Sequence, residues 1–130
     1  MPVHIKLTSI LVDDQENALN FYTSILGFVK KMDIPMGPDQ RWLTVVSAAA
    51  PDGIELVLEP NANPAAQAYQ QALFAQKIPL TMPFTDDLAA EHARLVALGV
   101  SFTMVPTPMP WGDMAVLNDT CGNLIALAQV

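Results

Sequence analysis

Two stretches of this chain repeat the same order of local signals, and that repeat limits the folds the chain can adopt. In each stretch an apolar segment is followed by aspartates that can cap a helix, and later by a glycine that can end it. The paired landmarks are Asp14 and Asp87, Gly27 and Gly99, and Ile54–Leu56 and Ile125–Leu127, at offsets of 73, 72 and 71 residues. An offset this steady predicts a duplicated structural unit.

The first stretch reads as strand, helix, strand, strand, strand. The helix is expected between Asp13 and Gly27, because its apolar residues recur every three or four positions. Strands are expected where β-branched and aliphatic residues run between turn clusters. These runs are Val3–Val12, Phe28–Ile34, Arg41–Ser47 and Ile54–Leu58.

The second stretch repeats this order after a short helix expected at Ala65–Ala75. Its helix is expected between Asp86 and Gly99, and Pro106–Gly112 is expected to be a long proline-rich loop. Its strands are expected at Ile78–Phe84, which carries two prolines typical of an edge or irregular strand, and at Val100–Val105, Met114–Asn118 and Leu124–Gln129. The predicted fold is α+β, with a βαβββ module at 1–60, a linker with a short helix at 61–77 and a second module at 78–130, together one domain.

Composition narrows the class of partner. Thirteen acidic residues against six basic ones give a net charge of −7, which repels nucleic acid. No apolar run approaches the roughly 18 residues of a membrane span. The single cysteine, Cys121, cannot form an internal disulfide, and the first residues do not resemble a secretory signal. We therefore expect a soluble cytoplasmic protein whose partner is a small molecule.

Several motifs along the chain match the positions of a known family. They are Val12-Asp13-Asp14, Phe21-Tyr22, Leu26-Gly27-Phe28 and Gly53-Ile54-Glu55-Leu56 in the first half, with Leu98-Gly99-Val100 and Asp119-Thr120-Cys121-Gly122-Asn123-Leu124-Ile125 in the second. With these motifs the chain resembles the vicinal oxygen chelate superfamily over nearly its whole length. That superfamily includes glyoxalase I, extradiol dioxygenases, fosfomycin-resistance enzymes and bleomycin-resistance proteins.

The resemblance implies that the strands of both modules curl into a cup-like mixed sheet with the helices on its outer face. Metal-dependent members of the family place one ligand on the first strand and one on the fourth strand of each module. Carried over to this chain, the four positions fall on Leu7, Glu55, Leu80 and Ala126. A divalent ion needs several converging donors, and only Glu55 supplies one. No metal and no other cofactor are therefore expected.

Neither histidine is expected to restore a metal site. His4 alternates onto the strand face opposite Leu7, and His92 falls on a helix that the family turns away from the cup. If the cup persists without a metal, it would be an apolar pocket with a few polar points. The residues expected to line it are Leu7, Ser9, Arg41, Trp42, Glu55, Val57, Leu80, Met82 and Trp111, the last on a loop able to close over the opening.

Glu55 is the only candidate for a catalytic role. An ionised, unpaired carboxylate in an apolar cup is costly unless Arg41 or a ligand cation offsets its charge. Three roles stay open for it. It could be an inherited position satisfied by Ser9 and a water, a docking point for an amine, or a general base.

The functional prediction is a glyoxalase/bleomycin-resistance-like protein that binds a small apolar or cationic molecule without the family's usual metal. The alternative is a metal-dependent lyase, isomerase or dioxygenase of the same superfamily with an altered site, for example one using Glu55 and Glu59 together. A scaffold whose cup is filled by its own side chains is a third reading. A homodimer is expected in each case because the modules have open sheet edges. The sequence leaves open whether modules pair within one chain or between two.

Overall fold

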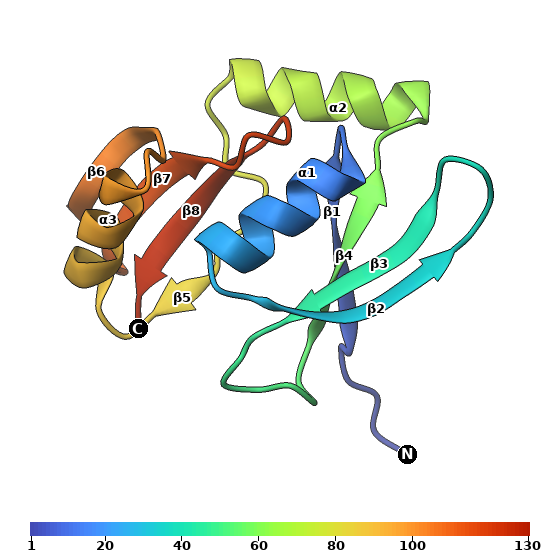
Figure 1. Cartoon of the computed structure of the whole chain (residues 1–130). Coiled ribbons are helices and arrows are strands. Elements are labelled where there is room, and N and C mark those ends of the chain that lie inside the picture. Colours follow the sequence, from blue (N-terminus) through green and yellow to red (C-terminus); the bar gives the residue numbers. More distant parts are fainter.

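A computed structural model describes all 130 residues, and it contains two four-stranded sheets (Figure 1). The first sheet has the order β1 (Leu7–Val12), β4 (Glu55–Pro60), β3 (Arg41–Val46) and β2 (Val29–Pro35). The second has the order β5 (Phe84–Thr85), β8 (Leu124–Gln129), β7 (Gly112–Asn118) and β6 (Phe102–Met109). In both sheets the first and fourth strands of the module are parallel and the other pairs are antiparallel. The predicted α+β fold with two βαβββ units is confirmed.

Three α-helices accompany the sheets. They are α1 (Gln15–Asn20), which continues as a single π-helical turn η1 (Phe21–Ile25), α2 (Pro64–Ala75) and α3 (Leu88–Ala97). Helices α1 and α3 each follow the first strand of a module, and α2 connects the modules (Figure 1). None of these helices combines the length and apolar character that crossing a membrane requires.

The helix caps that anchor the predicted repeat are present in both modules. The side chain of Asp14 accepts a hydrogen bond from Asn17 N at 3.0 Å, and that of Asp87 accepts one from Ala90 N at 3.0 Å. Each carboxylate satisfies a backbone N–H that the first helical turn leaves free. Gly27 and Gly99 have φ of +90° and +87°, the left-handed conformation that ends a helix at little steric cost for glycine.

The two sheets share one hydrophobic core. Figure 1 shows α1 lying between them, and a cluster of 15 buried residues draws side chains from both sheets and from the helices. The strand residues of this cluster are Ile10, Val12, Leu43, Val45 and Leu58 from the first sheet and Ala115, Leu117, Ile125 and Leu127 from the second. Because side chains alternate along a strand, the remaining face of each sheet points away from this core. Within one chain, therefore, the two free faces do not enclose a common cup.

Three strands differ most from their predicted bounds. Strand β1 begins at Leu7, and β5 comprises only Phe84–Thr85 because Pro79 and Pro83 cannot donate ladder hydrogen bonds. Strand β6 runs through to Met109, so most of the predicted proline loop is strand. Prolines are tolerated there because β6 lies at the sheet edge and its pairing with β7 shifts register twice.

A buried polar network joins the modules at the 119–123 turn. The Tyr22 hydroxyl donates to Asp119 Oδ2 at 2.7 Å, and Asp119 also accepts from Cys121 N, Asn123 N and Asn123 Nδ2 at 2.7, 3.1 and 2.8 Å. Burial raises the pKa of Asp119, although these bonds act in the opposite direction. Burial, followed by the nearby Asp119 charge, raises the pKa of Tyr22 well above its usual value.

Gln70 of α2 fastens the same turn to the first module. Its Nε2 donates to Leu11 O at 2.9 Å, to Cys121 O at 3.2 Å and to Asn123 Oδ1 at 2.9 Å. Gly122 lies against this amide, and a Cβ there would come within 2.9 Å of Nε2. The family-like motif at 119–123 therefore holds the two modules and the connecting helix together.

Candidate functional site

The free face of the first sheet carries most of the residues predicted to bind a ligand. The β1–β4 ladder pairs Leu7 with Glu55, Ser9 with Val57 and Leu11 with Glu59. The β3–β4 and β2–β3 ladders extend these rows across the sheet. The resulting surface, which we call the Glu55 face, comprises Leu7, Ser9, Leu11, Met32, Ile34, Trp42, Thr44, Val46, Glu55, Val57 and Glu59.

Glu55 is held on this face by a residue that the sequence analysis did not single out. The Thr44 hydroxyl donates to Glu55 Oε1 at 2.8 Å, and Thr44 Oγ1 accepts from Met32 N at 3.1 Å. Thr44 is fully buried, while Glu55 is half-buried. The suggested partnership of Glu55 with Ser9 is absent. Alternation from Trp42 along the predicted strand could have placed Thr44 on this face.

Arg41 does not lie beside Glu55, contrary to the suggestion that it offsets the Glu55 charge. Its Nη1 donates to Glu16 Oε2 at 2.6 Å, and its Nε and Nη2 donate to both oxygens of Asp33 at 3.0 and 2.7 Å. The hydrogen bond from Arg41 is the main cause that lowers the pKa of Asp33, and the two carboxylates raise the pKa of Arg41. Arg41 therefore ties β3 to β2 and α1 at the margin of the sheet.

In the second module the position equivalent to Leu7 belongs to Met82, whereas the sequence analysis assigned it to Leu80. Glu55 N donates to Lys6 O at 2.9 Å, and Ala126 N donates to Thr81 O at 3.0 Å. The next residues, Leu7 and Met82, are therefore equivalent in the parallel ladder. Leu80 packs against the shared core instead. The irregular backbone before β5 causes this change of register.

These four positions do not fit the divalent metal that the sequence resemblance implies. Leu7 and Ala126 have no donor atom, Met82 offers only a soft thioether, and Glu55 is a single carboxylate. No group of three or more His, Cys, Asp or Glu side chains is placed to share an ion anywhere in the chain. Glu59 lies on the same face as Glu55, but in the row beyond Val57.

Neither histidine lies on the Glu55 face. His4 is exposed in the segment before β1. His92 packs edge-on against Phe102, with ring centroids 4.6 Å apart. His4 thus lies outside the strand predicted for it, whereas His92 lies on α3, the helix predicted for it.

The free face of the second sheet has no ionisable side chain. Strand alternation places these residues on it: Met104, Thr107, Met114, Val116, Ala126 and Ala128, with Met82 and Phe84 at the β5 edge. Trp111 is 63% exposed in the tight turn between β6 and β7. It thus occupies the tip of a hairpin, not the long closing loop that was predicted.

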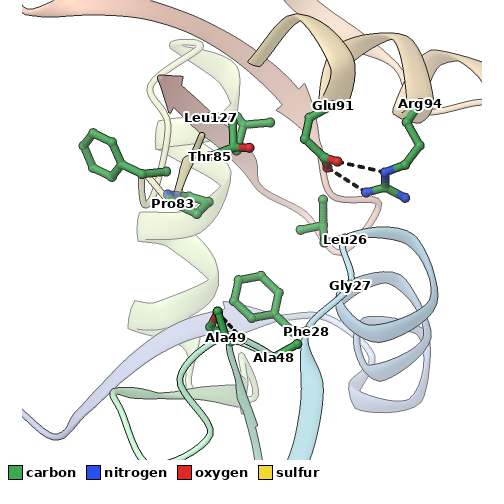
Figure 2. Close-up of a pocket in the computed structure, with 12 residues that line it drawn as sticks. Leu26, Gly27, Phe28, Ala48, Ala49, Pro83, Thr85, Glu91, Arg94 and Leu127 are labelled. Atoms are coloured by element: carbon green, nitrogen blue, oxygen red, sulfur yellow. Dashed lines mark hydrogen bonds and ion pairs between the residues drawn. The ribbon is translucent and has the colours of Figure 1, made fainter. Parts of the chain in front are cut away.

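A pocket lies elsewhere, between the two modules (Figure 2). It has a volume of about 610 Å³ and contains none of the nine predicted ligand-binding residues. Its walls come from the segment before β2, the β3–β4 loop, β5, α3 and β8. They include Leu26, Phe28, Leu127 and the Glu91–Arg94 ion pair at 2.8 Å. Because Leu127 belongs to the shared core, this pocket is an unfilled margin of that core, on the opposite side of the sheets from Glu55.

The architecture defines a class of protein. Two βαβββ modules, each with a parallel pairing of its first and fourth strands, present faces on which the Leu7–Glu55 and Met82–Ala126 pairs are equivalent. The chain is thus a tandem βαβββ protein.

Comparison with known proteins identifies the family. A family model described as Glyoxalase/Bleomycin resistance protein/Dioxygenase superfamily matches residues 3–127, and the chain belongs to this superfamily. It is 51% identical over 125 residues to YurT of Bacillus subtilis (strain 168), a protein described only as uncharacterized, covering 96% of this chain and 98% of YurT.

Solved structures show the same fold. UcmS2 is similar over 100% of both chains, with a TM-score of 0.84 and 30% identity. TnmS3, an antibiotic binding protein from Streptomyces sp. CB03234, is similar with a TM-score of 0.77 and 35% identity, over 98% of this chain and 96% of TnmS3.

Proposed function

We propose that this protein binds a small apolar or cationic molecule at the Glu55 face without a metal ion. The observation that carries the proposal is the donor set at the four equivalent positions, Leu7, Glu55, Met82 and Ala126. One carboxylate surrounded by apolar side chains is typical of a binding pocket with a single orienting group. The similarity to TnmS3, an antibiotic binding protein, supports the same class of function.

We also propose that the pocket is completed by a second copy of the chain. Strand β1 pairs only with β4, and β5 pairs only with β8, so each leaves one edge free. Apolar side chains line these edges: Leu7 is 45% exposed and Phe84 is 57% exposed. Pairing β1 of one protomer with β5 of its partner would cover both edges and turn the Glu55 face toward the methionine-bearing face of the partner's second sheet.

The test uses protein dialysed against a chelator and verified to be free of metal. In a Trp111→Phe variant, Trp42 is the only indole and reports directly on the Glu55 face. Titration with the planar dyes Nile red, which is neutral, and Nile blue, which is cationic, should give saturable binding that quenches Trp42 emission. One site per chain is expected, and the chelator should leave the affinity unchanged.

The control variants are Trp42→Leu, which should weaken dye binding, and Leu7→Asp, which should shift sedimentation from dimer to monomer. Charge on a free apolar edge opposes strand pairing between protomers. A metal ion retained at one per chain and bound at Glu55 would contradict the proposal. So would binding of neither dye, or a wild-type protein that sediments as a monomer.

A further inference from the structure

We infer that the ligand of the Glu55 face carries a protonated nitrogen, which donates a hydrogen bond to the free oxygen of Glu55, and that Thr44 positions this carboxylate. The inference rests on the proposed function, and it selects a cation from the apolar and cationic ligands that the proposal allows. Three observations support it: the direction of the hydrogen bonds at Thr44, the charge of the surrounding face, and the location of Trp42.

The direction of the hydrogen bonds fixes Glu55 as an acceptor. A threonine hydroxyl has one proton and accepts through its oxygen lone pairs. Because Met32 N–H donates to Thr44 Oγ1, the hydroxyl proton remains available for Glu55 Oε1 at 2.8 Å. No protein group donates to Glu55 Oε2, and the chain has no buried side-chain oxygen without a partner. Oε2 is therefore an acceptor open to solvent, and a ligand must meet it with a donor.

The charges around Glu55 favour a cationic donor over a neutral one. The positions that the ladders pair on the Glu55 face include two carboxylates, Glu55 and Glu59, and no basic residue, and Lys31 in the β2 bulge bonds to Pro51 O and Asp52. Five of the six basic side chains are engaged elsewhere, by Asp33, Glu16, Asp52 and Glu91 or by backbone oxygens near residue 52. The sixth, Lys77, follows α2. A hydrogen bond between a cationic N–H and a carboxylate is about twice as strong as one between neutral groups.

Trp42 supplies a flat surface beside the acidic groups. Trp42 lies two residues before Thr44 on β3, and the β2–β3 ladder pairs Trp42 with Ile34 and Thr44 with Met32, so Trp42 shares the face of Thr44 and Glu55. An indole face attracts an organic cation and stacks on a planar ring. The second sheet's free face adds methionines and no charge. A planar organic cation fits this combination of surfaces better than a neutral or anionic molecule of the same shape.

Nile blue and Nile red test the inference because they share a planar ring system and differ in charge and in N–H donors. In metal-free dimeric protein, Nile blue should bind at least about tenfold more tightly than Nile red. Glu55→Gln should reduce this ratio to near one. Thr44→Val should reduce it severalfold, and Thr44→Ser, which keeps the hydroxyl, should restore it. Glu59→Gln, which removes the same charge from the same face, should reduce the ratio less than Glu55→Gln.

The outcomes separate this inference from the proposed function. Equal binding of both dyes by the wild type would overturn the cation requirement and leave the proposed function standing. If Glu55→Gln and Glu59→Gln reduce the ratio of Nile blue to Nile red affinity equally, docking at Glu55 is overturned. Such a result would indicate that the cation responds only to the total negative charge of the face. Binding of neither dye would overturn both. If Thr44→Val keeps the wild-type ratio, Thr44 does not position the carboxylate.

Discussion

The hydrogen bond between Tyr22 and Asp119 gives the sharpest test of how the two modules are held together. Tyr22→Phe removes only the hydroxyl, and it keeps the ring contacts with Phe21 and Phe28 at centroid distances of 5.6 and 6.2 Å. A hydrogen bond to a charged group contributes about 1.5–3 kcal/mol. Asp119 Oδ2 keeps its bond from Asn123 Nδ2 at 2.8 Å, so no oxygen loses its last partner. We expect the free energy of unfolding to fall by about 2 kcal/mol.

The expected loss depends on pH, because the bond is strongest to ionised Asp119. The folded-state pKa of Asp119 is raised above its unfolded value, mainly by burial. Its contribution to stability is therefore complete below the unfolded pKa and is lost as pH rises through the folded value. Removing the Tyr22 bond raises the folded pKa further. The difference between wild type and Tyr22→Phe should therefore grow as pH rises through this range and shrink in acid.

Urea unfolding followed by circular dichroism, at one protein concentration, measures the effect from the midpoint at unchanged m-value. Tyr69→Phe is the matched control, because Tyr69 is 57% exposed and its substitution should change stability by less than about 0.5 kcal/mol. A loss in Tyr22→Phe no larger than in this control would refute the role of the Tyr22–Asp119 bond. A loss that does not shrink in acid would refute its dependence on an ionised Asp119.

Two further predictions concern the same turn. Burial raises the pKa of the Cys121 thiol to about 12. The native thiol should therefore resist Ellman's reagent at pH 8 and react at once in urea. Rapid labelling of the native protein would show that the turn opens readily. Gly122→Ala should lower the free energy of unfolding in urea by about 2–4 kcal/mol. The added Cβ would clash with the Gln70 amide, and residue 122 has a φ of +97° that alanine adopts only with strain. Gly27→Ala, with φ of +90° and no atom within 4 Å of the added Cβ, should cost about 1 kcal/mol, and equal costs at both positions would contradict the clash.

Local signals predicted the module fold because both helices are specified by residues next to them in sequence. Asp14 and Asp87 cap the helices through bonds to residues three positions later, and Gly27 and Gly99 end the segments. The second module's first strand was less predictable, because the prolines at 79 and 83 shorten β5 and change its register. That change involves pairing with β8, about 45 residues away, and no local pattern reports it.

The candidate site was predictable only where strand alternation suffices. Alternation along regular strands places Leu7, Ser9, Trp42, Glu55 and Val57 on one face, and the ladders agree. The wrong predictions concern residues whose locations are set by contacts with residues distant in the sequence. Ion pairs with Glu16 and Asp33 hold Arg41 at the margin of the sheet. Leu80 packs against the shared core.

The location of the motif residues explains why this sequence indicates its superfamily more clearly than its ligand. Tyr22, Asp119, Gly122 and Asn123 belong to the network that joins the modules, and none of them touches the Glu55 face. Recognition by those motifs therefore identifies how the modules are joined. Under the proposed function, ligand choice depends instead on side chains of the Glu55 face, which lie outside the shared core. Exchanging Glu55 alone should change which ligand binds and leave the unfolding midpoint nearly unchanged. Exchanging Tyr22 should instead lower the unfolding midpoint and leave the choice of ligand unchanged.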